Sequence, residues 1–368
     1  MSRWTGKIIG FTVLGGAFAY PLVPGAERLV ADLFQQALGP KLALLFIFAI
    51  LALGLHVVVG CTGLLHLGIA AFFGVGAYAL AISTVKSNPF QVGFLPGIFI
   101  AVTASTALGV VLSAPLLRLR GDYLALVTMG FGLVIMYLLR NFQSITNGMQ
   151  GINPIPSPDL HLFGSVGLAP LVEFIGIKPD WSADYRLFYY LTLGYLVLAY
   201  IFVWNLERSR LGRAWVAIRE DELAASCMGI NAARAKLAAL AVGAGLAGLA
   251  GGLFATRLTS TSEPTNAYNF NVSMTMICCL ILGGLGNRNG VLIGVTLVFG
   301  YDQIFAPVMD AWVQRNDLNP GGKVYYSFSG WKLLIFGSSL ILMMLLRPQG
   351  VLPAVRDTFR SRATKGNG

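Results

Sequence analysis

Ten apolar segments recur along this 368-residue sequence, separated by more polar stretches of very different length. They lie at residues 8–23, 42–60, 62–83, 94–117, 122–140, 187–205, 237–256, 273–285, 291–309 and 331–347. A helix needs about 20 mainly apolar residues to cross a bilayer. Only 11% of the residues are charged, whereas a soluble domain carries about 25%. The sequence therefore predicts an all-α polytopic membrane protein and excludes a soluble globular protein, a disordered chain and a disulfide-stapled secreted domain.

Two of these segments leave alternatives open. Segment 273–285 is short and ends in the glycine-rich stretch Gly283–Gly286, so it can be a tilted, broken or re-entrant span. The first segment follows Arg3 and Lys7 and contains Ala17-Phe18-Ala19, a pattern that a cleaved signal peptide would share.

The Lys and Arg residues predict the orientation of the chain, because cytoplasmic loops carry an excess of them. With the N-terminus inside, the cytoplasmic side holds 16 of the 26 basic residues and only six acids, which accounts for the whole net charge of +10. An odd number of spans would place either the basic loop 206–236 or the basic tail 348–368 outside. The sequence therefore predicts ten spans with both termini in the cytoplasm. It shows no basic patch interleaved with aromatic residues, so no nucleic-acid partner is expected.

We expect one transmembrane domain over residues 1–368, with two long loops. The external loop 141–186 is rich in Pro and Gly, which restrict and extend the backbone, and is expected to form an ordered cap or docking surface. The other long loop is the cytoplasmic stretch 206–236.

The cytoplasmic loop contains the strongest local signal in the chain. From Ala214 to Met228 it has no Pro or Gly, and its apolar residues recur at helical spacing, which predicts an amphipathic helix of about four turns. Gly229 is placed to end this helix, and Asn231 to cap the next one. A basic membrane-surface loop is one interpretation. The other is a docking element for another protein, since a rigid helix between two spans can transmit motion into the bilayer.

Several short sequence motifs resemble those of a known family. Glu222-Leu-Ala-Ala-Ser-Cys-Met-Gly229 resembles the coupling motif of ABC importer permeases, which seats in the cleft of the ATPase subunit. The more specific words are Gly60–Gly68, Ala70–Tyr78, Leu117–Thr128, Thr146–Gly148, Gly212–Ala214, Ala217–Ala225, Met228–Asn231, Gly248–Gly251 and Leu282–Gly286. Together they cover about residues 42–350 and resemble the LivM-type membrane subunit of branched-chain amino-acid ABC importers. The chain departs from the family at His66-Leu-Gly-Ile69, where members often have Ser-Leu-Gly-His or Ser-Leu-Gly-Gln, so the exact solute stays open.

The resemblance implies an ABC importer permease fold in a bacterial inner membrane. It implies four kinds of partner around the translocation pathway: a second, LivH-like permease subunit, two cytoplasmic ATPase subunits, a periplasmic solute-binding protein and the lipid bilayer. The solute would be Leu, Ile, Val or a related small polar molecule. The residues that it assigns to ATPase coupling are Arg219, Asp221, Glu222, Ala224, Ala225 and Gly229. ATP and Mg²⁺ would bind the partners, because this sequence has no Gly-x-x-x-x-Gly-Lys-[Ser/Thr] loop, and no cofactor is expected in this chain.

Four further residues are candidates for the pathway or its mouth: His66, Asn147, Gly148 and Asp302. Asp302 lies within an apolar segment, where an acid costs about 2.5–3.5 kcal/mol on insertion scales. A pathway or proton-relay role is open for it, but a polar contact with a neighbouring helix or subunit is the expected one. Ala244, Gly248 and Gly252 are spaced four apart and are expected to form a small-residue packing face.

Other function classes find little support. The three histidines and four cysteines show no ligand spacing, so neither a metal site nor a thiol-redox site is expected. No cluster of catalytic residue types lies in the apolar segments, so the chain is expected to be non-catalytic. An ion-coupled secondary transporter is the alternative, with only Asp302 and the histidines to carry ions.

Overall fold

A computed structural model describes residues 38–85, 92–116, 122–156, 158, 161–163, 166–167, 185–261, 268–315, 327–347 and 350–352. The first predicted span, 8–23, lies outside these residues, as do residues 168–184 of the 141–186 loop and nearly all of the basic tail 348–368. Contacts divide the chain into two units, one of residues 47–277 and one of residues 1–46 with 278–368.

The described residues are almost entirely helical. The helices are α3 (Leu38–Leu55), η1 (His56–Cys61), α4 (Ile69–Thr84), α5 (Phe94–Leu116), α6 (Asp122–Asn141), α7 (Gln143–Thr146), η2 (Gly148–Gln150), α9 (Tyr185–Arg208), α10 (Arg210–Glu220), α11 (Glu222–Cys227), α12 (Ala232–Leu258), α14 (Phe270–Gly283), α15 (Arg288–Gly300), η3 (Tyr301–Phe305), α16 (Ala306–Arg315) and α17 (Lys332–Leu346). Two very short antiparallel strands, β1 (His161–Phe163) and β2 (Val166–Gly167), are the exception to an all-α fold.

Six helical stretches in the described residues are long and apolar enough to cross a membrane. They are Leu38–Cys61, Phe94–Ser113, Tyr123–Asn141, Arg186–Arg208, Ala232–Leu258 and Arg288–Arg315. Three more apolar helices, α4, α14 and α17, are shorter. Nine of the ten predicted segments therefore form apolar helices, and the chain is a helical protein with several candidate membrane spans.

The segment predicted as a span at 62–83 begins later than expected. Its helix, α4, starts at Ile69, and residues 63–68 are not helical. Gly63 adopts a positive φ of 73°, and the amide of Leu67 donates to Thr128 Oγ1 at 3.1 Å. Gly68 also lies against the Thr128 carbonyl, where a side chain would not fit. Apolar composition alone did not distinguish this closely packed, non-helical stretch from a helical turn.

Segment 291–309 also differs from its prediction, because the helical stretch is longer. It runs from Arg288 to Arg315 and includes the π-helical turn η3 between α15 and α16. Segment 273–285 becomes the short helix α14, which ends before Gly284 and Gly286, two glycines with positive φ.

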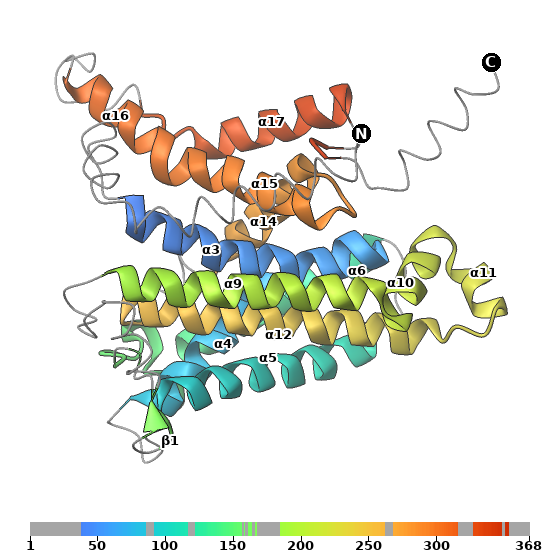
Figure 1. Cartoon of the computed structure of the whole chain (residues 1–368), viewed down its shortest axis with the longest axis horizontal. Coiled ribbons are helices and arrows are strands. Elements are labelled where there is room, and N and C mark those ends of the chain that lie inside the picture. Colours follow the sequence, from blue (N-terminus) through green and yellow to red (C-terminus); the bar gives the residue numbers. More distant parts are fainter. Residues whose placement is uncertain are drawn as a thin grey trace. The chain divides into compact units, whose positions relative to one another are not determined.

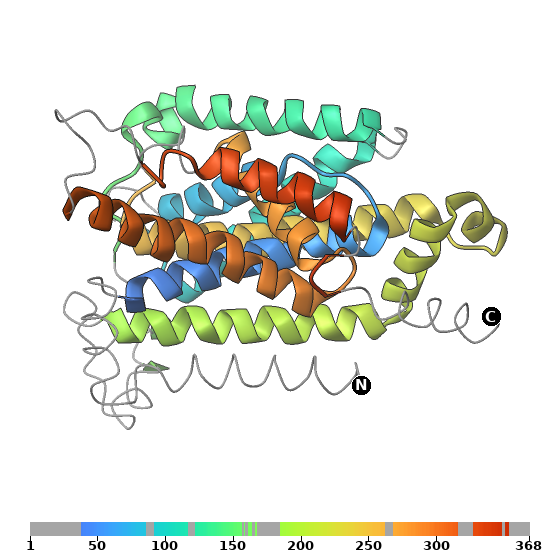
Figure 2. The ribbon, with the colours of Figure 1, turned by 90° about the horizontal axis from the view of Figure 1, so that it is seen from above.

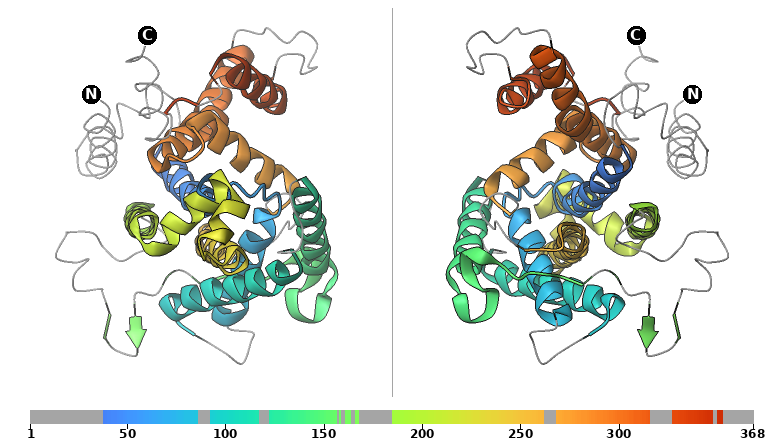
Figure 3. Two further views of the ribbon diagram at one scale, coloured as in Figure 1. Left: turned by 90° about the vertical axis from the view of Figure 1, so that its right-hand side faces the viewer. Right: turned by 90° about the vertical axis from the view of Figure 1, so that its left-hand side faces the viewer.

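In the unit of residues 47–277, α12 packs between α4 and α5, and Figure 3 shows it, in gold, beside both. Ala244, Gly248 and Gly252 form the predicted small-residue face, which contacts Ala101, Ser105 and Gly109 of α5. A second glycine face meets α4. A Cβ at Gly251 would overlap the Phe73 carbonyl, and one at Gly76 would overlap the backbone of Gly248. Small residues thus allow these helix backbones to touch.

The same unit has two distinct ends. The helices α10 and α11 project at one end, beyond α9 and α12, and β1 lies at the other end (Figures 1 and 2). At the β1 end, the loop after α6 pairs with the residues that follow α12. The Thr261 amide donates to the Ile152 carbonyl, and the Ile152 amide donates in return to Thr261 Oγ1. The Ile155 amide donates to the Thr259 carbonyl at 2.8 Å.

In the other unit, α14 and α15 approach through glycines. Gly283 contacts the backbone of Gly290, and Gly294 contacts that of Cys279. The chain after α17 returns to this glycine-rich turn, where Val351 donates to the Leu282 carbonyl at 3.0 Å.

Candidate functional site

The loop between α9 and α12 folds as a helical hairpin of α10 and α11, which we call the α10–α11 hairpin (Figure 1). The predicted single helix from Ala214 to Met228 is wrong. The first helix already begins at Arg210, and the chain breaks at Asp221, whose backbone is extended. The Asp221 carboxylate accepts from the amides of Leu223 and Ala224 at 2.8 and 3.0 Å and so caps α11.

The base of the hairpin is fixed by local and long-range contacts. Ser209 caps α10 by accepting from the Gly212 amide, and Gly212 lies so close to the carbonyls of Leu206 and Glu207 that a side chain would clash. Trp215 is fully buried, and its indole Nε1 donates to the Ala235 carbonyl in the first turn of α12 at 2.7 Å. The hairpin is therefore attached firmly to α12.

Two predicted coupling residues make contacts within the chain. Arg219 Nη1 donates to the Gly60 carbonyl at 2.6 Å, which joins α10 to the π-helix η1 that ends the α3 span. Glu222 Oε1 accepts from Lys236 Nζ at 2.6 Å, and Lys236 is buried. These side chains hold the hairpin against η1 and α12, a role that sequence position alone did not reveal.

The end of α11 follows the prediction closely. Gly229 has a φ of 81°, and a Cβ there would meet no atom within 4 Å, so its backbone conformation is the reason for glycine. The amide of Ile230 donates to the Ala225 carbonyl and that of Gly229 to the Ser226 carbonyl, which is the Schellman pattern of helix termination. Asn231 Oδ1 then caps α12 by accepting from the Arg234 amide at 3.0 Å.

The tip of the hairpin leaves apolar side chains exposed. Leu223 is 70% exposed and Met228 is 83% exposed, and the small Ala224 between them is exposed as well. Ala225, by contrast, is buried within the hairpin. Exposed apolar side chains on a rigid, polar-flanked element are typical of a protein-binding surface.

His66 lies in the non-helical residues 63–68, away from the hairpin tip. Its ring is buried and stacks on Phe72 with centroids 5.6 Å apart. Within the described part of the chain, neither ring nitrogen has a hydrogen-bond partner. The geometry therefore places His66 in the packing between the start of α4 and its neighbours.

Asn147 and Gly148 form a tight turn between α7 and η2. Both have a φ of 60°, and the Asn147 side chain donates to the Gly151 carbonyl at 2.9 Å. Gly148 is buried, and its amide donates to Thr146 Oγ1. These contacts shape the loop after α6.

Asp302 has partners on its own and a neighbouring helix. Its carboxylate lies 3.4 Å from Lys332 Nζ of α17 and accepts from Gln303 Nε2 at 2.9 Å. Lys41 Nζ donates to the Gln303 carbonyl at 2.6 Å in the same unit. Asp302 thus makes the expected contact between helices.

The residue that sequence reasoning missed at the hairpin is Trp215. The available signal was its position three residues before the apolar Ile218, on the same helical face, in an otherwise charged loop. Both side chains are buried, and only the fold identifies their partner as α12.

The apolar helices indicate a multi-pass membrane protein, and the α10–α11 hairpin lies outside the stretches that are long and apolar enough to span a membrane. Comparison with known proteins then identifies its family. Residues 41–344 match the family described as "Branched-chain amino acid transport system / permease component". The chain belongs to this family of non-catalytic membrane permease subunits.

Individual relatives agree with the family match. The chain is 38% identical over 334 residues to the high-affinity branched-chain amino acid transport system permease protein LivM of Escherichia coli K12, covering 88% of this chain and 72% of the relative. It is 37% identical to LivM of Salmonella typhimurium over 331 residues, 88% of this chain and 71% of the relative. LivH of Escherichia coli K12 is 24% identical over 315 residues, 83% of this chain and 91% of the relative. No solved structure matches this chain.

Proposed function

We propose that this chain is the LivM-type membrane subunit of an ATP-driven importer of Leu, Ile, Val or a related small solute in a bacterial inner membrane. The observation that carries this proposal is the α10–α11 hairpin, with an anchored base and an exposed apolar tip, in a chain of the permease family. Residues 1–368 would form one permease domain, and ATP with Mg²⁺ would bind the partner ATPase subunits.

We also propose ten spans with both termini in the cytoplasm. Two sets of contacts support the side of the membrane that this arrangement assigns to the span ends. Arg219 and Glu207 contact residues 56–60, as expected if the spans at 42–60 and 187–205 both end inside. Ile152 and Ile155 bond with residues 259–261, as expected if the 141–186 loop and the end of the 237–256 span both lie outside.

The partners would be a LivH-like second permease subunit, two ATPase subunits and a periplasmic binding protein. The similarity of this chain to both LivM and LivH supports a pair of related permease subunits. The hairpin tip would insert into a groove of one ATPase, where Leu223 and Met228 would be buried.

In this account, ATP binding and hydrolysis at the partners select between two conformations of the membrane core. The hairpin would carry motion by three connections: directly along the chain to α9 and α12, through Trp215 to α12, and through Arg219 to the end of η1. The binding protein would deliver the solute on the side of the 141–186 loop.

The experiment compares two matched variants, Met228→Glu at the tip and Met149→Glu on the opposite loop. Both methionines are exposed, but only Met228 lies on the hairpin. A carboxylate in an apolar groove loses its hydration, so Met228→Glu should weaken co-purification with the ATPase subunits by about tenfold or more, with uptake reduced in parallel. Met149→Glu should leave ATPase association unchanged.

Uptake of labelled Leu, Ile and Val into proteoliposomes, with the binding protein outside and ATP inside, tests the rest of the proposal. Uptake should require ATP and all subunits. ATPase association that is equal in both variants would refute docking at the tip. Uptake that needs an ion gradient, and no ATPase, would instead favour the secondary transporter.

A further inference from the structure

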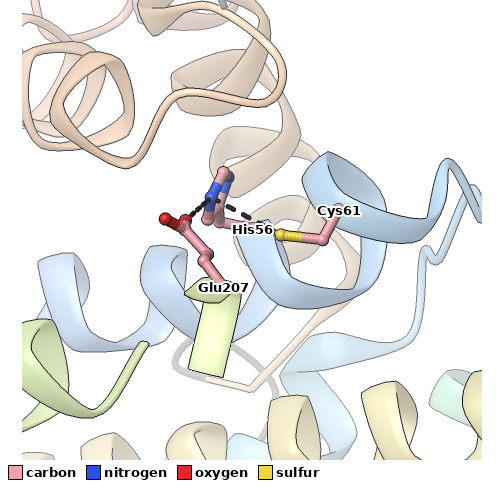
Figure 4. A group of neighbouring side chains, drawn as sticks. All are labelled: His56, Cys61 and Glu207. Carbon is pink, nitrogen blue, oxygen red and sulfur yellow. Dashed lines mark hydrogen bonds and ion pairs between the residues drawn. The ribbon is translucent and has the colours of Figure 1, made fainter. Parts of the chain in front are cut away.

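Three side chains with metal-ligand atoms converge next to the hairpin, although the spacing of the histidines and cysteines predicts no metal site. They are His56 and Cys61 of η1 and Glu207 in the last turn of α9 (Figure 4). His56 Nε2 lies 3.0 Å from Glu207 Oε1 and 3.8 Å from Cys61 Sγ, and the three ligand atoms all lie within 4.8 Å of one another.

The π-helical turn explains why the two η1 residues meet. In an α-helix, residues five apart do not lie on the same face, because one turn takes 3.6 residues. In a π-helix the backbone bonds run from i to i+5, so His56 and Cys61 lie one above the other. Gly60 completes the turn, since a side chain there would overlap the His56 imidazole. Glu207 comes from 151 residues away and closes the third side.

We propose that His56, Cys61 and Glu207 form a binding site for a divalent transition-metal ion of the Zn²⁺ class. One nitrogen, one sulfur and one oxygen ligand make a borderline-soft set that suits Zn²⁺ and disfavours Mg²⁺ or Ca²⁺, which prefer oxygen. Three protein ligands leave one of the four positions of a tetrahedral ion for water.

The dimensions of the cluster are compatible with this ion. Zn²⁺ bonds of about 2.0–2.3 Å to nitrogen, oxygen and sulfur place tetrahedral ligand atoms about 3.3–3.6 Å apart. Two separations, 3.0 and 3.8 Å, bracket that range, and the third pair, Cys61 and Glu207, lies within 4.8 Å, so the ligand atoms would have to close in by up to about 1 Å around an ion. His56 and Cys61 are buried, whereas the Glu207 side chain is 25% exposed and gives an ion access to the site.

Occupancy of the site would join η1 to α9 two residues before Ser209, which caps α10. A bound ion would therefore fix the base of the hairpin. This consequence rests on the proposed function, whereas ion binding itself is a property of the chain and is tested without transport.

The test uses the purified full-length chain under reducing conditions, with Co²⁺ as a spectroscopic probe. The expected result is one Co²⁺ per chain with a thiolate-to-cobalt charge-transfer band, displaced by Zn²⁺. Cys61→Ser should remove this band and lower the affinity for Zn²⁺ by about tenfold or more. Cys227→Ser, which changes an exposed cysteine outside the cluster, should keep both. A wild-type chain without the band, or Cys61→Ser with unchanged binding, would overturn the proposal.

A second measurement avoids variants, which matters because a change at a buried residue can impair folding. X-ray absorption of the Zn²⁺-loaded wild-type chain should show one sulfur at about 2.3 Å together with nitrogen and oxygen at about 2.0–2.2 Å. A shell of nitrogen and oxygen alone would indicate surface binding and exclude the Cys61 site.

Discussion

The α10–α11 hairpin and the packing of α12 against α4 and α5 are held together by different kinds of residue. In the packing of α12, glycines remove side chains so that helix backbones touch over many turns, as Gly251 does against Phe73. In the hairpin, a few large or charged side chains, Trp215, Arg219 and Lys236, fix the base and leave the tip free. The comparison indicates a closely packed helical core and a hairpin that is attached to it at its base; under the proposed function, the hairpin would transmit motion to that core.

Substitution of Trp215 should have the largest effect on the stability of the hairpin. Its side chain is fully buried, and it is the one tryptophan within α10, α11 and α12. Trp215→Ala removes the packing and the hydrogen bond to the Ala235 carbonyl, and we expect a loss of about 3–5 kcal/mol in the local stability of the hairpin. Hydrogen exchange of the α10 amides measures this loss. Trp331→Ala, at a tryptophan that is 52% exposed, is the control and should change exchange little. Equal protection in wild type and Trp215→Ala would show that the hairpin needs no anchor.

Substitution of Gly251 should have a smaller effect, on the stability of the packed helical core. Gly251→Ala forces α12 away from the Phe73 carbonyl, and overpacking of this kind costs about 1–3 kcal/mol. The same substitution at Gly194 of α9, where a Cβ would meet no atom within 4 Å, should be neutral or stabilising by up to about 1 kcal/mol through helix propensity. Thermal unfolding of the two purified variants in detergent separates them. Equal midpoints would mean that α4 and α12 are not in backbone contact.

The features that the sequence predicted well depend on neighbouring residues only. Apolar length predicted α5, α6 and α9 nearly to their ends, and the positive φ of Gly229 and the Asn231 cap follow from residue types at one position. The short motifs also predicted the family, which matches residues 41–344.

The features that were missed depend on the fold. The break at Asp221 could have been predicted locally, because an acid at this position can cap the helix that follows. The helical spacing of apolar residues on both sides of Asp221 favoured one continuous helix instead. No local pattern could place Arg219 on the Gly60 carbonyl or Glu207 on His56, because these contacts join residues more than 150 positions apart. Assigning Arg219 and Glu222 to ATPase coupling by motif alone overlooked their contacts within the chain.

The central claim, that the hairpin tip docks the ATPase, can be tested with the native chain. Cys227 is exposed at the end of α11, whereas Cys61 and Cys279 are buried, so it is the natural site for a maleimide probe. Alkylation of Cys227 is followed by peptide mass spectrometry with and without the ATPase subunits. If the hairpin tip docks the ATPase, Cys227 should be strongly protected in the assembled complex and rapidly labelled in the free chain. Equal labelling of Cys227 in both states would contradict it.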